Sequence, residues 1–470
     1  MKVSMREVAR CLALACVVLQ ARPGLALDWG MQARVSAIDS DNLAQAPKGL
    51  EESATIGVVE LGAELEHSTK YLLLDAEASH AYRHFFQSAF DDENRSQLRA
   101  SFSWMPVRDV LRLSVTETYG QLALNPAEGL LPSNYENANV VTAGPTAMIP
   151  LGPDTRIVAE GEYRAASFSE SPVDTSRRFG QLSIERELSR VFTAHAGVSA
   201  ARVDFDIDGL SRGYDVKSVD AGVDAVGRRT SLGLQAGRDT VDFGGDRFTG
   251  SSYQLNVERR LTRATRLFAT ARQEITDSAQ VFQLGQVTDP AMSSIRDVQL
   301  TSQPMQRTQY RLGWVWAGAR ASLNLQGGFI NERFDVLLPD PLLAPGVNRI
   351  VREYGLDTRY RLRGGSTLGA SVQVLRESFQ GGLRSNDLFA TVSYTRQFSD
   401  KLGLELRAQR IERTESPRDF RELRLFAFLT YALRDLREPR AAVFDRQFER
   451  RIQRERSPAR AASPAGDDAE

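Results

Sequence analysis

The sequence predicts an all-β fold, a transmembrane antiparallel up-and-down β-barrel of about 18 to 20 strands. Three observations predict it: an export signal at the N-terminus, apolar and polar residues that alternate over segments of about ten positions, and connections between these segments that alternate in length. We expect three parts along the chain, a signal peptide (1–26), the barrel (27–433) and a periplasmic tail (434–470).

The N-terminal segment has the pattern of a secretory signal peptide. Its basic residues are Lys2, Arg6 and Arg10. The apolar run from Cys11 to Leu19 is too short to span a bilayer, and the small residues of Gly24-Leu25-Ala26 follow it. We therefore expect cleavage after Ala26.

Both cysteines lie in this segment, so the mature chain is expected to carry no thiol or disulfide. A lipoprotein alternative would place cleavage just before Cys16. It is less favoured, because it leaves an apolar stretch of only Cys11 to Ala15.

Composition limits the class of protein further. After the signal no stretch reaches the 18 or so consecutive apolar residues that a membrane helix needs, and mean hydropathy is -0.33. The formal net charge of -1 gives no basic surface for nucleic acid. Lysine occurs only at positions 2, 48, 70, 217 and 401, so arginine dominates the basic residues; genome composition and an arginine-lined pore both explain this.

Alternation of apolar and polar residues runs from Trp29 to Leu433. Because successive side chains of a strand point to opposite faces, each segment has one apolar and one polar face. One segment places Val59, Leu61, Ala63 and Leu65 opposite Glu60 and Glu64.

The polar faces are predicted to line a water-filled lumen with charges of both signs. The predicted lumen residues are Glu60, Glu64, Asp75, Glu77, Arg99, Arg112, Glu160, Arg164, Arg311, Arg359, Arg361, Glu405 and Arg407.

Short connections are expected on the periplasmic side and longer ones outside the cell. The short turns are predicted near 66–70, 105–109, 151–154, 189–190, 227–230, 262–265, 317–320, 363–366 and 399–401. The loops are predicted at 39–54, 87–95, 121–136, 169–178, 207–213, 244–250, 277–305, 335–350, 380–386 and 415–419. An even strand number brings both termini to the periplasmic side. A β-propeller would show a repeating blade of about 40 residues, which is not visible.

The tail from Arg434 is rich in Arg and Glu up to Arg456, and 457–470 is rich in Pro, Ala, Ser and Asp. Such a composition cannot bury a core, so we expect partial disorder, with a short helix over 441–454 as one option.

The motif Asp41-Asn42-Leu43, directly after the first predicted strand, resembles the β-barrel porin family found in exopolysaccharide gene clusters of Gram-negative bacteria. Ser40 departs from that family's pattern. The resemblance implies an outer-membrane channel, with exopolysaccharide export machinery as a partner. Many barrels end on an aromatic residue, whereas here Phe426, Phe428 and Tyr431 precede the tail and are expected to hold the assembly signal internally.

No metal, cofactor or catalytic residue is predicted. The four histidines are His67, His80, His84 and His195. His80 and His84 lie where a strand is expected to run out into a loop; on a strand they would be about 13 Å apart, too far for one metal. Ser79 and His80 are adjacent, so they point to opposite faces and form no dyad. His195 is expected in the lumen, and an enzyme is disfavoured.

Other patterns have ordinary explanations. Gly244-Gly245-Asp246 and Gly364-Gly365 are predicted turns and not phosphate loops, because they lack the strand-to-helix context. Glu160 and Glu162 beside Arg164 could suggest acid and base chemistry, but mixed charges are usual in a barrel lumen. The segment 277–305 is equally well a constriction loop or an external loop.

The sequence therefore predicts a porin-like channel for passive passage or export of solutes, in contact with outer-membrane lipid and without nucleic acid. The alternative is a non-conducting structural or assembly barrel that docks a periplasmic partner through its tail. The oligomeric state is not indicated.

Overall fold

The computed structural model describes residues 28–86, 90–123, 135–169, 174–207, 210–243, 246–276, 304–334, 348–414 and 419–433. The predicted signal peptide, the predicted tail and the segment 277–303 of the proposed constriction loop lie outside these ranges.

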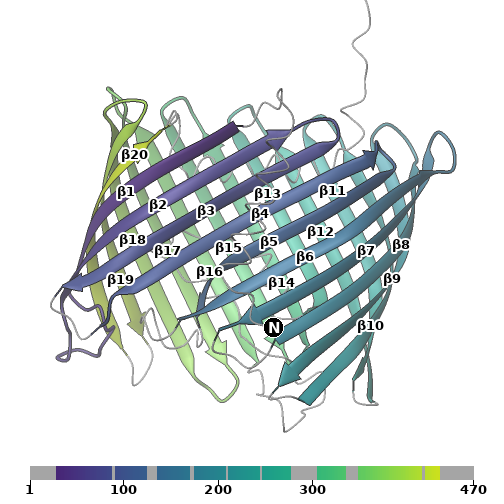
Figure 1. The fold of residues 1–470 in the computed structure, drawn as a ribbon, viewed down its shortest axis with the longest axis horizontal. Helices are drawn as coiled ribbons and strands as arrows, with labels where there is room; N and C mark the ends of the chain where they lie inside the picture. The colour runs from purple at the N-terminus through teal and green to yellow at the C-terminus, as the bar shows by residue number, and fades with distance from the viewer. Residues whose placement is uncertain are drawn as a thin grey trace, which may run out of the picture.

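Twenty strands form one sheet in which each strand pairs antiparallel with its neighbours in the chain, and β20 pairs with β1 (Figure 1). The strands are β1 (Asp28–Ser40), β2 (Ala54–Ser68), β3 (Leu72–Phe86), β4 (Glu93–Val107), β5 (Leu111–Ala123), β6 (Tyr135–Pro150), β7 (Thr155–Phe168), β8 (Asp174–Glu187), β9 (Phe192–Ile207), β10 (Leu210–Val226), β11 (Thr230–Phe243), β12 (Asp246–Arg260), β13 (Thr265–Thr276), β14 (Met305–Ala317), β15 (Ala321–Arg333), β16 (Arg349–Arg361), β17 (Ser366–Phe379), β18 (Arg384–Gln397), β19 (Leu402–Thr414) and β20 (Phe420–Ala432). The predicted fold class, the even parity and the upper end of the predicted count are confirmed.

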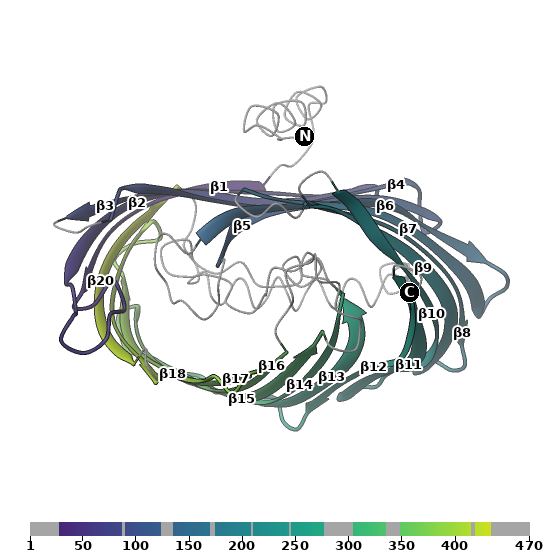
Figure 2. The same cartoon turned by 90° about the horizontal axis from the view of Figure 1, so that it is seen from below.

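The ring is flattened (Figure 2). Strands β1 to β7 form one long wall, β11 to β18 form the opposite wall, and the remaining strands turn the two ends. The ring of strands is therefore longer in one direction than in the other.

The predicted faces are confirmed by exposure of the side chains. Val59 and Leu61 are 50% and 56% exposed on the outside, whereas Glu60 between them is 1% exposed. Aromatic residues are exposed near the short-turn ends of the strands, as in the interfacial girdles of membrane barrels. They include Trp29, Trp104, Phe192, Trp316, Tyr360 and Tyr431.

Three predicted loops extend too far. The connections fall within the predicted ranges 169–178, 207–213 and 244–250, but β8 begins at Asp174, β9 runs to Ile207, β10 begins at Leu210, and β12 begins at Asp246. Strands here hold between 12 and 17 residues, whereas about 9 to 11 cross the bilayer. The surplus lies outside the apolar band, where outward residues such as Arg202 and Asp204 are polar. Phe205 and Tyr214 are buried on the inner face there, so the apolar residues have changed sides and the outward pattern that marks a membrane strand is lost. The predicted glycine turn is confirmed, since Gly364 and Gly365 have φ of 73° and 76°.

The Asp41-Asn42-Leu43 motif lies at the seam where β20 meets β1. The Asp41 backbone N–H donates to the Leu423 carbonyl at 3.2 Å, and the Leu423 N–H donates to Asp41 Oδ1 at 2.7 Å. Asn42 is fully buried; its Nδ2 donates to the carbonyls of Ala46 (2.8 Å) and Arg421 (3.0 Å), and its Oδ1 accepts from the Ala46 N–H at 2.9 Å. The motif thus joins the first external connection to the last strand.

Leu43 fixes the same connection to the inner wall. It is 4% exposed and belongs to a buried cluster of inward side chains from β1, β2, β3 and β20. The other members are Ile38, Ala54, Ile56, Val58, Ala81, Phe85, Phe426 and Phe428, with Phe90 packed against them. The first residues of the connection 41–53 therefore pack against the lumen side of the seam, whereas Leu50 is exposed.

Replacing Asn42 with Ala should lower the free energy of unfolding by about 2 kcal/mol, because buried backbone groups of Ala46 and Arg421 lose their partner. Urea titration of the folded barrel measures this change. Asn94→Ala is the control, since Asn94 is exposed on the outer face of β4. Equal stability of the two variants would contradict the role given to the motif.

Leu325→Lys places a charge near the middle of the apolar band, at a side chain 52% exposed on the outside. We expect a loss of about 2 to 4 kcal/mol. The neighbouring Gln326 faces the lumen, so Gln326→Lys should change the unfolding midpoint far less. Equal losses would mean that the two faces are assigned wrongly.

Candidate solute pathway in the lumen

All thirteen predicted lumen residues lie on the inner face of the ring, since each alternates with outward apolar side chains. Register brings some of them together: Glu77 lies directly opposite Arg99 on β4. Arg164 donates to Glu162 Oε1 at 2.8 Å, and Arg407 donates to Glu405 through Nε at 2.9 Å. The inner wall is therefore lined by local pairs of opposite charge.

The inner wall has two zones. Toward the short turns its charged side chains, such as Glu64, Arg311 and Arg361, are exposed to the interior. Toward the external ends the charged side chains are buried, with Glu332, Arg349 and Glu422 at 0 to 1% exposure. Because a buried charge needs hydrogen-bonded partners, this second zone is a network and not a loose lining.

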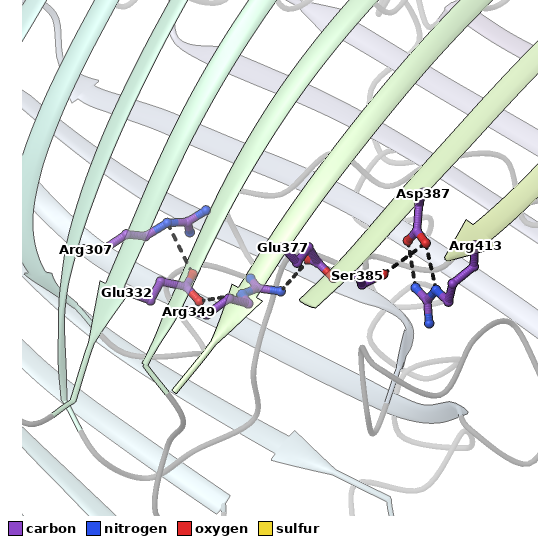
Figure 3. Close-up of polar contacts among 7 residues, drawn as sticks. All are labelled: Arg307, Glu332, Arg349, Glu377, Ser385, Asp387 and Arg413. Atoms are coloured by element: carbon purple, nitrogen blue, oxygen red, sulfur yellow. Dashed lines mark hydrogen bonds and ion pairs between the residues drawn. The ribbon is translucent and has the colours of Figure 1, made fainter. Parts of the chain in front are cut away.

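A row of alternating charges crosses the external ends of β14 to β17, and is here called the ion ladder (Figure 3). Arg307 Nε lies 3.6 Å from Glu332 Oε1. Arg349 Nε donates to Glu332 Oε2 at 3.1 Å, and Arg349 Nη1 donates to Glu377 Oε1 at 3.4 Å. Arg349 thus bridges two carboxylates from strands on either side of its own.

A second pair lies beside the ion ladder on β18 and β19. Arg413 donates two hydrogen bonds of 2.7 Å to the two oxygens of Asp387, and both side chains are at most 3% exposed. Ser385 donates to Asp387 Oδ1 at 3.1 Å, and the Arg413 guanidinium lies 5.9 Å from the Phe420 ring. A two-pronged geometry of this kind holds both groups in one orientation.

The seam carries another buried carboxylate. Glu422 accepts hydrogen bonds from Ser40 at 2.6 Å, from Gln45 at 3.1 Å and from Arg424 at 2.5 and 2.8 Å. Ser40 and Gln45 flank the Asn42 motif. The first external connection and the last strand therefore share one charged centre on the inner wall.

Arginines also stack on aromatic rings inside the ring. The guanidinium carbons of Arg34 and Arg407 lie 5.4 and 5.3 Å from the Phe428 ring centroid, and Phe428 stacks on Phe426 at 5.7 Å. Phe426 and Phe428 are buried inside, and of the three aromatics grouped as an assembly signal, Tyr431 faces outward. That these three residues hold the assembly signal stays a prediction. Tyr431 is the one among them whose side chain faces lipid.

The histidines do not meet one another. His195 lies in the lumen as predicted, with Nδ1 3.6 Å from Asp224 Oδ2, and His67 is buried near the end of β2. The loop predicted around His80 and His84 is wrong, because both lie within β3 on its outward face.

His84 and Tyr82 bind Asp92, in the connection that follows β3. Tyr82 donates to Asp92 Oδ2 at 2.5 Å, and His84 Nδ1 lies 2.8 Å from Oδ1. These hydrogen bonds lower the pKa of the Asp92 carboxyl to about 2, and the bond from Tyr82 has the largest effect.

The spacing of residues in the sequence did not predict one contact of a histidine. His80 Nδ1 lies 2.8 Å from Ser96 Oγ, because register places the two residues directly opposite on β3 and β4. Within the described ranges no carboxylate is hydrogen-bonded to His80, so this pair lacks the third group that orients a catalytic histidine. Nor do those ranges hold a group of three or more His, Cys, Asp or Glu side chains placed to bind a metal.

The buried charges at the external ends were also missed. They lie near the external ends of their strands and are Glu332, Arg349, Glu377, Asp387, Arg413 and Glu422. A usable signal existed: each continues the inward parity of its own strand. Their pairing, however, depends on register between strands.

The ring has an apolar outer band, an aromatic girdle at its short-turn end and a charged interior, and its closure leaves no strand edge for lipid to meet. The chain is an outer-membrane β-barrel. No helix among the described residues is long and apolar enough to span a bilayer.

A scan against protein-family models and a search of curated proteins find no match. Among solved structures the chain is similar to the FrpB iron transporter from Neisseria meningitidis (F3-3 variant), at 9% identity and a TM-score of 0.47, covering 89% of this chain and 83% of that one. It is also similar to the siderophore receptor PirA from Pseudomonas aeruginosa, at 12% identity and a TM-score of 0.45, covering 88% of this chain and 81% of that one. It is similar as well to the copper transporter OprC, at 11% identity and a TM-score of 0.45, covering 86% of this chain and 80% of that one. The barrel geometry itself defines the class of this protein.

Arg349→Met should destabilise the barrel by about 3 to 5 kcal/mol, because it removes a shared partner of two carboxylates in a buried network. Arg311→Met removes an exposed lumen arginine and should cost less than about 1 kcal/mol. Guanidinium unfolding of the two variants checks the difference. A cost for Arg349→Met as small as that of its control would show that the two buried carboxylates do not depend on Arg349 for compensation.

Proposed function

We propose that this protein is a porin-like channel for passive passage or export of solutes across the outer membrane. The observation that carries the proposal is the exposed, mixed-sign inner wall of a twenty-stranded ring. Barrels of 16 or more strands are wide enough for an aqueous path unless something fills them.

In this channel the two zones have different tasks. The exposed charges near the short turns interact with hydrated solutes, since selectivity follows pore diameter and the placement of charges. The ion ladder and the seam network hold the shape of the external mouth, because their charges are already paired within the wall.

Planar-bilayer recording of the refolded mature chain, residues 27–470, tests the proposal. Stepwise conductance is expected, and its absence from heat-modifiable, β-rich protein would overturn it. Glu64→Gln combined with Glu77→Gln should shift the zero-current potential toward anion preference. Glu412→Gln is the matched control, because Glu412 pairs with Arg421 on the outer face and should leave that potential unchanged.

Exopolysaccharide is the cargo that we propose from the resemblance of the Asp41-Asn42-Leu43 motif. These three residues lie at the barrel seam, so their contacts support the architecture and do not bear on the cargo. Concentration-dependent block of single-channel current by an anionic exopolysaccharide, and not by dextran of similar size, is the expected result. Docking through the tail 434–470 stays the alternative prediction.

A further inference from the structure

Two arginines lie directly opposite each other on the outer surface near the external ends of neighbouring strands. Register pairs Arg352 of β16 with Arg376 of β17, and Arg376 in turn with Asn386 of β18. Opposed residues have Cβ atoms about 4.5 to 5.5 Å apart. Arg384, two positions before Asn386, is on the same face, and all four side chains are exposed.

This arrangement is unfavourable by itself, because like charges directly opposite on a sheet repel each other. Within the described residues Arg352, Arg376 and Arg384 have no ion-pair partner, and the outward face of β15 to β18 holds no carboxylate. The outward Glu412 of the next strand pairs with Arg410 and Arg421. The cluster of Arg352, Arg376 and Arg384, here called the outer arginine cluster, therefore has unused capacity for an anion.

The height of the cluster indicates which anion. The next outward row toward the short turns is Tyr354, Val374 and Leu388, which register places side by side. Below that row the outward residues are Leu356, Val372 and Ala390. The arginines thus stand at the upper edge of the apolar band, where the lipid headgroups of the outer leaflet begin.

We propose that the outer arginine cluster binds the phosphate groups of the phosphorylated glycolipid of the outer leaflet. Each guanidinium offers a planar fork of donors that matches phosphate oxygens, and a bound phosphate would relieve the repulsion between Arg352 and Arg376. Asn386 adds an amide donor at the end of the row. Basic clusters beside a membrane commonly bind anionic headgroups.

The test is binding of bis-phosphorylated lipid A to the folded mature chain in detergent, measured by native mass spectrometry. The Arg352→Gln/Arg376→Gln double variant should bind at least about tenfold more weakly, as expected for loss of one or more charge-assisted hydrogen bonds. The Arg352→Lys/Arg376→Lys variant keeps both charges and should stay closer to the unaltered protein. Arg396→Gln is the matched control, because Arg396 is outward and exposed on β18 but at its opposite end.

An unchanged affinity in the double Gln variant, or an equal loss in Arg396→Gln, would overturn the proposal. A second measurement does not depend on any variant folding: the unaltered protein should bind bis-phosphorylated lipid A at least about tenfold more tightly than the dephosphorylated lipid. Equal binding of these two would overturn it as well. Binding of phosphatidylglycerol as tight as that of lipid A would overturn the assignment to the glycolipid.

Discussion

Closure of the strand ring is the constraint on which the rest of this structure depends. In lipid an unpaired strand edge exposes backbone groups that no water can satisfy, so β20 must pair with β1. That pairing joins residues from the two ends of the barrel sequence. Asn42, for example, donates to the Arg421 carbonyl, 379 positions away in the chain. Asp41, Asn42, Leu43 and Glu422 gather at this seam, which explains why a short polar motif directly follows the first strand.

Closure also creates an interior, and the interior is not uniform. Near the short turns, charged side chains meet the lumen and are exposed. Near the external ends the ion ladder, the Asp387–Arg413 pair and the seam network bury their charges against each other and against aromatic rings. A buried pair contributes little net stability but fixes geometry, and removal of one partner is costly. The external mouth is thus the end of the proposed channel whose charges are held in buried pairs.

Arginine has different surroundings on the two faces of the same strands. Inward arginines such as Arg349 and Arg413 share carboxylates within the wall, whereas outward arginines such as Arg352 and Arg376 oppose each other. Guanidinium groups are therefore placed on both surfaces of the wall, and those of the lumen stand among carboxylates. The outward ones stand where a membrane would supply the counter-charge.

The sequence by itself determined the fold class, the strand number within two, and the face of each strand that meets lipid. It could do so because side-chain alternation is a local property with a period of two residues. It misjudged strand ends such as those around Ile207 and Asp246, because outward residues turn polar beyond the apolar band while the hydrogen bonding between strands continues. Only the tertiary structure decided which residues meet: Ser96 opposite His80, Arg349 between Glu332 and Glu377, and Asn42 beside β20. Those contacts depend on cross-strand register and on closure of the ring, which join positions far apart in the chain and leave no local pattern to read.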